Sequence, residues 1–317
     1  MSAMRNVVVS RIQSLAPGIK EFTFIAPPGE ELSRFSAGSH IVIHSVLKGK
    51  PHHNPYSLLG SPDDPYWRIA VRRQEVSRGG TAYMHEALKE GDTLRVSEPI
   101  NLFPLVRLGR KYILVAGGIG VTPILSHARE MSRLKMDFEV HYAVRSPEYL
   151  VFGDELRALA PGRFHIYYDS EQQRPNFRAL FGNQPLGTHT YVCGPTGMID
   201  ACLGAGRAAG WPESHLHSEK FLAAEHGEEF TVVAAQSNVT ITVASDTSLL
   251  DALEEAGLNP PCLCRGGACG QCEAEVVSCD SEFVHRDIFL TDAEKSSRKK
   301  IMPCVSRVKG GTLILNI

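Results

Sequence analysis

A group of cysteines near the C-terminal end has the residue type and spacing of a metal centre. The stretch PPCLCRGGACGQCE, residues 260–273, contains the pattern C-x4-C-x2-C, and one more cysteine lies further along the chain. This is the plant-type spacing for a [2Fe-2S] cluster, in which each iron takes two thiolates and bridging sulfides complete the coordination. The glycines between the cysteines would let the backbone wrap closely and direct N–H groups at the sulfurs. The sequence therefore predicts four metal ligands: Cys264, Cys269, Cys272 and Cys304.

Other interpretations of the cysteines are a structural zinc site and buried packing residues. A structural zinc site usually presents two C-x2-C pairs, so the observed pattern fits zinc poorly. Cys262 would make the first spacing C-x6-C, which favours Cys264 as the first ligand. The remaining three, Cys193, Cys202 and Cys279, are interpreted as small apolar packing residues.

A second motif lies in the middle of the chain, in YILVAGGIGVTPILSHA. An apolar strand ends in Gly117, Gly118 and Gly120, and we expect a helix with Thr122 at its N-cap and Pro123 at its first position. Backbone N–H groups at such a turn suit a pyrophosphate, although a glycine-rich turn alone is weak evidence and the G-x-G-x-x-G pattern is absent.

A third motif, YVCGPTGM, places Cys193, Gly194 and Pro195 at the end of another apolar strand. Open parallel sheets bind ligands beyond the carboxyl ends of their strands. We therefore expect the two turns to contribute to one ligand site.

The composition limits the class of protein. The chain has 317 residues, of which 43% are hydrophobic and 21% charged, with a formal net charge of −2. These values predict a globular chain of two or three domains. The chain lacks the excess of basic residues that a nucleic-acid-binding protein needs, so that class of protein is excluded. We expect no membrane span and no secretion signal, and a cytoplasmic location in which clustered thiols serve metal or redox chemistry.

The pattern of hydrophobic residues divides the chain into three segments. Short alternating runs separated by Pro and Gly predict an antiparallel β-barrel up to about residue 105, with one helix at Ala82–Leu88. From about 108 to 220, strands alternate with helices, which predicts an α/β segment with a parallel sheet. LAAEHGEEF is expected to be a linker, followed by a hairpin, a helix and the cysteine loop.

In combination and order, these motifs resemble a known family. VAGGIGVTP and YVCGPTGM are similar to the nicotinamide-binding signatures of the ferredoxin-NADP reductase superfamily, and PYSLLGS resembles its flavin motif R-x-Y-S-L. With the cysteine loop at the C-terminus, the chain resembles the phthalate dioxygenase reductase family, which includes reductases of vanillate and dicamba demethylases and of carnitine monooxygenase. The resemblance implies a flavin-binding β-barrel at 1–106, an NAD-binding α/β domain at 107–222, a linker at 223–230 and a β-grasp ferredoxin domain at 231–317.

The resemblance also implies the cofactor contacts, with FMN as the flavin. Flavin contacts are expected from Tyr56, Ser57, Leu58, Ala70 and Val71, phosphate contacts from Arg78, Gly79, Gly80 and Thr81, and a covering aromatic ring from Phe221. Nicotinamide nucleotide contacts are expected from Gly117, Gly118, Gly120, Thr122, Pro123, Arg145, Ser146, Cys193, Gly194 and Pro195.

The chain departs from the family's flavin motif at its first position. Asn54 stands where the motif has Arg, so the phosphate charge is expected to be met by Arg78, Arg73 or a nearby histidine, or FMN to be held more weakly. Arg145 follows a strand where it would accept a 2′-phosphate, whereas Asp169, at a comparable strand end, would repel one. We expect NADH, mainly from the resemblance.

The expected activity follows from the electron count of each cofactor. A nicotinamide gives two electrons as hydride and a [2Fe-2S] cluster takes one, so a flavin must stand between them. The resemblance implies that electrons pass from NADH through FMN and the cluster to the Rieske centre of a partner oxygenase, and that the reductase is a monomer. Two alternatives are a redox sensor without sustained turnover and a flavohaemoglobin-like or ferric-reducing enzyme, the latter disfavoured because no oxygen-activating motif is visible.

Overall fold

The first part of the chain forms one antiparallel sheet in the computed structural model, which describes residues 4–47, 49–75, 79–222 and 226–317. Its strands follow the order β4-β3-β6-β1-β2-β5, and β7 pairs with β3. They are β1 (Met4–Ala16), β2 (Ile19–Ile25), β3 (Ser39–Leu47), β4 (Lys50–Ser57), β5 (Trp67–Arg72), β6 (Thr93–Ser97) and β7 (Ile100–Asn101). We call residues 4–101 the barrel lobe.

The barrel lobe closes because its two end strands meet. Leu59, just after β4, forms an antiparallel bridge with Arg68 of β5, and its N–H donates to the Arg68 carbonyl over 2.8 Å. Alternate residues of the strands point inward, as a curved sheet with one buried face requires. Helix α1 (Gly80–Glu86) adds Met84 to this core.

The second part is a parallel sheet with helices on both faces, in the order β10-β9-β8-β11-β12. Its strands are β8 (Lys111–Gly117), β9 (Phe138–Val144), β10 (Phe164–Tyr168), β11 (Thr188–Cys193) and β12 (Leu216–Glu219). Its helices are α2 (Val121–Arg133), α3 (Gly153–Leu159), α4 (Phe177–Gly182) and α5 (Thr196–Ala208), with short 3-10 turns at Gly118–Gly120, Pro147–Tyr149, Asp169–Glu171 and Glu213–His215. We call residues 111–219 the α/β lobe. Strands β8 and β11 are buried on both faces, which explains the nearly continuous apolar sequence of β8.

The third part is a mixed sheet of order β14-β13-β19-β15-β17 with a separate pair, β16 and β18. Its strands are β13 (Phe230–Ala234), β14 (Val239–Val243), β15 (Ala274–Cys279), β16 (Phe283–Val284), β17 (Lys300–Ile301), β18 (Arg307–Val308) and β19 (Thr312–Leu315), and its helices are α6 (Leu249–Glu255) and α7 (Asp292–Ser297). We call residues 230–315 the C-terminal lobe. Its cysteine loop runs between α6 and β15.

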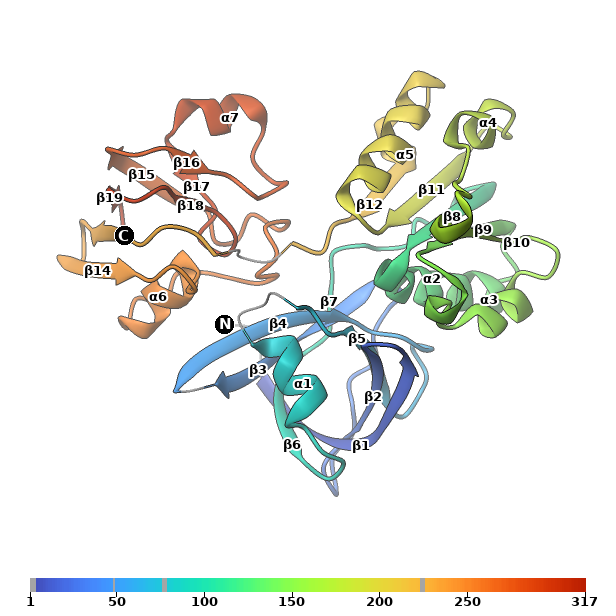
Figure 1. Cartoon of the computed structure of the whole chain (residues 1–317), viewed down its shortest axis with the longest axis horizontal. Helices are drawn as coiled ribbons and strands as arrows, with labels where there is room; N and C mark the ends of the chain where they lie inside the picture. Colours follow the sequence, from blue (N-terminus) through green and yellow to red (C-terminus); the bar gives the residue numbers. More distant parts are fainter. Residues whose placement is uncertain (1–3, 48, 76–78, 223–225) are drawn as a thin grey trace.

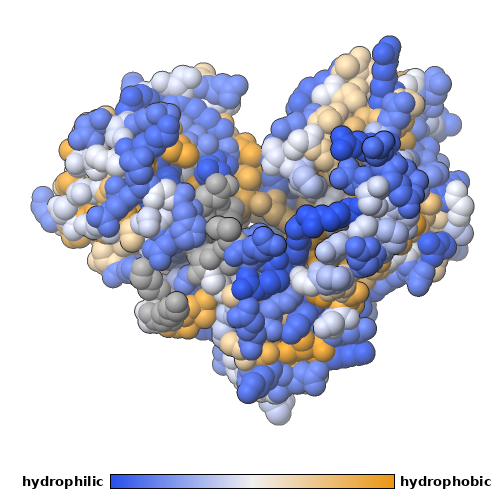
Figure 2. Space-filling view, viewed as in Figure 1, coloured by the Kyte–Doolittle hydropathy of each residue, from blue (hydrophilic) through white to orange (hydrophobic). Residues whose placement is uncertain are grey.

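The three lobes surround a common centre. Figure 1 shows the barrel lobe below, with the α/β lobe and the C-terminal lobe above it on opposite sides. In the space-filling view the two upper lobes are separated by a notch at whose base hydrophobic residues come to the surface (Figure 2). Within the described ranges, none of the helices combines the length and apolar character needed to cross a membrane.

The expected fold class is confirmed, with local differences. The barrel, the parallel sheet and the hairpin followed by a helix all form where their patterns placed them. The helix expected at Ala82–Leu88 begins two residues earlier, at Gly80. Thr122 is not an N-cap: a 3-10 turn at Gly118–Gly120 leads directly into α2 at Val121, and the Thr122 hydroxyl donates back to the Ile119 carbonyl of that 3-10 turn.

Candidate functional site

A single cavity of about 690 Å³ lies where the three lobes meet. This volume falls in the range of small-molecule and cofactor sites. From the barrel lobe it is lined by His40, Asn54, Tyr56, Ser57, Ala70, Val71, Arg72, Arg73 and Thr81, from the α/β lobe and the segment after it by Ile119, Thr122, Arg145, Glu219, Phe221 and Leu222, and from the C-terminal lobe by Cys264, Gly266, Ala268 and Ile288.

The flavin motif forms the barrel side of the cavity. Tyr56 and Ser57 end β4, where they pair with Ile41 and His40 of β3. The Tyr56 hydroxyl is buried without a hydrogen-bond partner among the described residues, and burial raises the pKa of Tyr56. A buried hydroxyl of this kind has its hydrogen-bonding capacity left for a ligand. Leu58, expected as a contact, instead turns into the barrel core and is fully buried there.

The segment expected to take the phosphate lies at the start of α1. Thr81 lines the cavity, while Gly79 and Gly80 form the turn before it. A Cβ added at Gly80 would lie 2.1 Å from the Asn54 amide oxygen, so only glycine allows this close approach. Asn54 thus packs directly against the helix start. Arg78 lies outside the described residues.

Two described arginines of the barrel lobe line the cavity. Arg72 and Arg73 both belong to the lining, so either could supply the positive charge that Asn54 does not bring. Arg73 already forms an ion pair with Glu86 at 2.9 Å, which reduces the charge that it can offer to a phosphate.

The two glycine-rich turns meet at the carboxyl ends of β8 and β11. These strands pair in parallel, with Cys193 opposite Ala116. A Cβ at Gly120 would lie 2.3 Å from the Cys193 carbonyl oxygen, and one at Gly194 would lie 2.9 Å from the Gly117 Cα. The turns therefore touch backbone to backbone, and from the first of them Ile119 and Thr122 line the cavity. Pro195 precedes α5, and the side chain of Pro123 is buried in α2.

The residues expected at the adenosine end follow neighbouring strands. Arg145 and Ser146 come after β9, and Arg145 lines the cavity. Asp169 comes after β10, and the Ser170 N–H donates to the Arg145 carbonyl over 2.8 Å, which places the two strand ends side by side. The Asp169 carboxylate forms an ion pair with Arg174 at 3.0 Å.

Phe221 and a neighbouring carboxyl close the cavity from the segment after β12. The Phe221 side chain lines the cavity and is 49% exposed. Glu219, at the end of β12, lines it too, and its Oε2 is buried with no hydrogen-bond partner among the described residues. Burial raises the pKa of Glu219 to about 8, so its carboxyl is protonated at neutral pH and can donate a hydrogen bond.

Sequence reasoning missed Glu219 and His40. His40 is buried in β3 and lines the cavity, and burial lowers its pKa to about 4, so the ring is neutral. The only sequence signal for Glu219 was its position two residues before Phe221.

The four expected cluster ligands come together in the C-terminal lobe. The Cys272 and Cys304 sulfurs lie 3.3 Å apart, and the Gly266 N–H donates to the Cys264 sulfur over 3.4 Å. A contact with the Cys269 thiol, followed by several backbone N–H groups, lowers the pKa of Cys264 to about 5. Convergent thiols surrounded by backbone donors fit an iron-sulfur cluster, whose ligands are thiolates and whose sulfurs accept such bonds.

The remaining cysteines agree only in part with their expected packing role. Cys193 and Cys202 are fully buried, but Cys279 is half-buried, and its sulfur contacts Ser281. Cys262 points toward Glu254 and Arg265, at 3.6 and 3.5 Å, rather than toward the other thiols. This geometry supports Cys264 as the first ligand.

The chain matches two family models. Residues 100–216 match the N-terminal domain of the dimethylamine monooxygenase subunit DmmA-like family, and residues 232–309 match the 2Fe-2S iron-sulfur cluster binding domain. The second match covers all four cysteines that come together in the C-terminal lobe.

Curated relatives and a solved structure match the whole length. The chain is 45% identical to the heme-dependent oxidative N-demethylase beta subunit of Ectopseudomonas mendocina, with 100% of each chain covered. It is 42% identical to the carnitine monooxygenase reductase subunit of Acinetobacter baumannii, covering 99% of this chain and 98% of the relative. The structure of phthalate dioxygenase reductase, described as modular for electron transfer from pyridine nucleotides to [2Fe-2S], superposes with a TM-score of 0.88 at 32% identity, covering 99% and 98% of the two chains. The chain therefore belongs to the phthalate dioxygenase reductase family, the oxidoreductases that use NADH, FMN and a [2Fe-2S] cluster as reductase subunits of oxygenase systems.

Proposed function

We propose that this chain moves electrons from NADH through FMN and a [2Fe-2S] cluster to a terminal oxygenase. The observation that carries the proposal is the single cavity shared by Tyr56 and Ser57, by Thr122 and Arg145, and by the cluster loop at Cys264. FMN held in this cavity would supply the conversion from two-electron to one-electron transfer that a [2Fe-2S] cluster requires.

Each wall of the cavity has its own task. Tyr56, Ser57, Ala70 and Val71 would hold the flavin ring, with Phe221 covering it. Gly79, Gly80 and Thr81, with Arg72 and Arg73, would hold its phosphate. The touching turns around Gly120 and Cys193 would hold the nicotinamide nucleotide, and Cys264, Cys269, Cys272 and Cys304 would hold the cluster.

The protonated Glu219 carboxyl fits a polar ring placed in this cavity. It donates rather than accepts a hydrogen bond at neutral pH, and it adds no negative charge beside the electron-rich cofactors. The neutral ring of His40 likewise adds no charge.

An anaerobic NADH titration of the holoprotein tests the electron path. We expect visible absorption to show both flavin and iron-sulfur bands bleaching, and low-temperature EPR to show one reduced cluster per chain. Flavin bleaching without a cluster signal would contradict the cluster half of the path. Sustained NADH-dependent reduction of cytochrome c would separate this enzyme from a redox sensor that does not turn over.

For the acceptor, we propose the Rieske centre of a partner oxygenase. A heme-dependent oxygenase is a second candidate, because the relative from Ectopseudomonas mendocina is named as a subunit of a heme-dependent N-demethylase. The two candidate acceptors can be distinguished by an activity assay. The reductase, NADH and substrate are combined either with a purified Rieske oxygenase or with a heme-dependent demethylase subunit. Faster substrate-dependent NADH oxidation with only one of them identifies the acceptor.

The proposal includes three further points. NADH is preferred to NADPH, supported by Asp169 beside Arg145, and a higher kcat/KM for NADPH would contradict this. The functional domains span 1–106, 107–222 and 231–317, joined by a linker at 223–230, supported by the family matches to 100–216 and 232–309. The chain acts in the cytoplasm, supported by its clustered thiols, which the reducing cytosol preserves, and as a monomer, which the family resemblance implies.

A further inference from the structure

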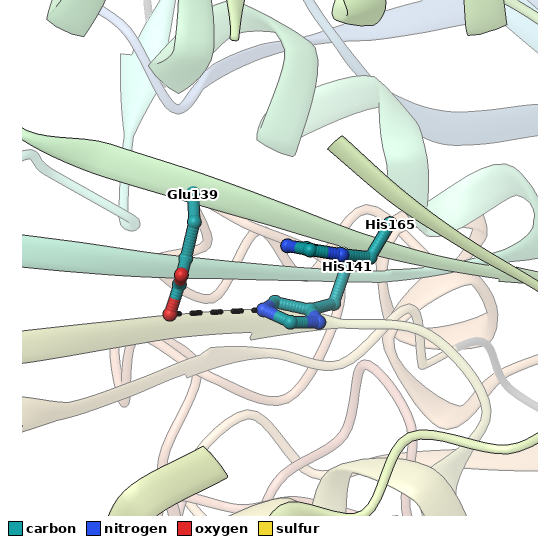
Figure 3. Close-up of side chains that lie close together, drawn as sticks. All are labelled: Glu139, His141 and His165. Atoms are coloured by element: carbon teal, nitrogen blue, oxygen red, sulfur yellow. Dashed lines mark ion pairs between the residues drawn. The ribbon is translucent and has the colours of Figure 1, made fainter. Parts of the chain in front are cut away.

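Two histidines and a carboxylate gather on the α/β lobe, away from the redox cavity. Glu139 and His141 lie two residues apart on β9, so their side chains share one face of the sheet, and His165 of β10 pairs in parallel with His141. Figure 3 shows the Glu139 carboxylate and the two imidazole rings close together on this face. None of the three lines the redox cavity.

The potential ligand atoms of the three side chains lie close enough together to share one metal ion. One donor atom from each lies within 4.8 Å of the others. The Glu139 Oε1 and the His141 Nε2 are 3.8 Å apart, too far for a hydrogen bond, and the two imidazole rings stack with centroids 4.7 Å apart. Metal–ligand distances of about 2.0–2.2 Å would require these atoms to approach by roughly an ångström or less.

One metal-binding atom of the group has no hydrogen bond. The His141 Nε2 is buried without a hydrogen-bond partner among the described residues, whereas the buried Glu139 Oε1 has the Lys111 ammonium as an ion-pair partner. His141 is only 5% exposed, so bulk water does not readily supply the missing partner. A buried polar atom without a partner is costly, and a bound ion would satisfy it.

A tyrosine fixes the other side of the His141 ring. The Nδ1 of His141 lies 2.9 Å from the Tyr167 hydroxyl. When this nitrogen carries the proton and donates to Tyr167, the lone pair of Nε2 faces the carboxylate. Metal-binding histidines are usually oriented by such an outer hydrogen bond.

One cation already lies beside the carboxylate. Lys111 competes, since its Nζ lies 3.4 Å from Glu139 Oε1, but it is also held at 2.9 Å by the Gln184 side chain on its other side.

We propose that Glu139, His141 and His165 form a mononuclear site for a divalent transition metal of the Zn²⁺ class. Two imidazoles and one carboxylate favour Zn²⁺ and its neighbours over Mg²⁺ or Ca²⁺, which prefer all-oxygen ligands. The exposed ring of His165 gives the ion access from solvent, and water completes the coordination. A bound ion would link β9 to β10 at the edge of the parallel sheet, and so would stabilise the α/β lobe.

The test is equilibrium dialysis of the holoprotein, with its cluster and flavin loaded, against Zn²⁺. We expect one zinc per chain with iron and flavin contents unchanged, and no comparable uptake of Mg²⁺. H165Q, at an exposed position, should fold normally and bind zinc at least about tenfold more weakly, because even loss of an outer partner costs about that much. Y167F should weaken binding by about 10–100-fold, and K111M should strengthen it by removing the competing cation.

A matched control uses another group of histidines in the same lobe. His189, His215 and His217 stack on one another, and H215Q should leave zinc uptake unchanged. Absence of zinc uptake by the wild type, wild-type uptake by H165Q, or loss of uptake in H215Q would each overturn the proposal. Because the cluster and flavin contents are measured in the same samples, zinc bound by displaced cluster cysteines would be recognised by loss of iron.

Discussion

His53 of β4 lies 3.4 Å from a carboxylate oxygen of Asp251 in α6, and this contact joins the barrel lobe to the C-terminal lobe. Arg265, in the cysteine loop, pairs with the same carboxylate at 3.2 Å. Both side chains are largely buried, so the contact is weakly screened by salt. The Asp251 carboxylate thus contacts both the barrel lobe, through His53, and the cysteine loop, through Arg265.

We expect H53Q to slow electron transfer from flavin to cluster while hydride transfer from NADH is unchanged. Loss of a partly buried pair worth about 1 kcal/mol reduces the equilibrium constant for docking of the two lobes by about fivefold. Stopped-flow absorption separates the two steps. H226Q, in the exposed linker, is the control, and equal slowing of both steps by H53Q would show that it does not act on docking.

The touching turns predict a steric requirement for glycine. In G120A the new Cβ would meet the Cys193 carbonyl at 2.3 Å, so the two turns must separate. We expect a loss of about 1–3 kcal/mol in the free energy of unfolding and a raised KM for NADH. G204A is the matched control, because a Cβ there meets nothing within 4 Å inside α5, and alanine should stabilise the helix by up to about 1 kcal/mol. An unchanged KM in G120A would contradict the assignment.

Cys264 and Cys262 are expected to respond differently to substitution, because only Cys264 is assigned as a cluster ligand. C264S should lose the iron-sulfur absorption and cytochrome c reduction, while flavin reduction by NADH persists. C262S should keep the cluster, because the Cys262 sulfur points toward Glu254 and Arg265. Iron and sulfide content distinguishes the outcomes, and cluster loss in C262S alone would reverse the assignment.

Glu219 gives a pH-dependent prediction. When unfolded, its carboxyl loses its proton near pH 4.5, but in the folded state burial keeps the pKa at about 8. The unfolded state therefore binds fewer protons between these values, and stability falls as pH rises through this window. E219Q removes this dependence and should gain on the order of 1–3 kcal/mol over the wild type by pH 8, after allowance for screening. Thermal melts at pH 5 and pH 8 check this, and an equal difference at both would contradict the raised pKa.

Local sequence patterns were sufficient for the sheets and for the glycine turns. Each depends on residues close together in the chain, such as the strand that ends at Gly117. The start of α2 was missed at Thr122 because a 3-10 turn, which has no distinct residue signature, replaces the cap.

Relationships between distant segments could not be obtained in the same way. The approach of Gly266 and Ala268 to Tyr56 depends on how two lobes pack, and no periodicity records it. Glu219 is a single carboxyl in a short strand, and only burial among other elements gives it a raised pKa. Leu58 lies within a binding motif, but it follows the last residue of β4 and its side chain packs in the barrel core.

The shared cavity wall has a kinetic consequence. Cys264 and Tyr56 line the same cavity within one chain. Electron transfer from the proposed flavin site to the proposed cluster site is therefore an intramolecular step. Its rate constant is first order and does not change on dilution, whereas delivery to the oxygenase is second order and depends on the concentration of both proteins. The cell can therefore adjust flux through the abundance of the oxygenase without altering the internal half of the route.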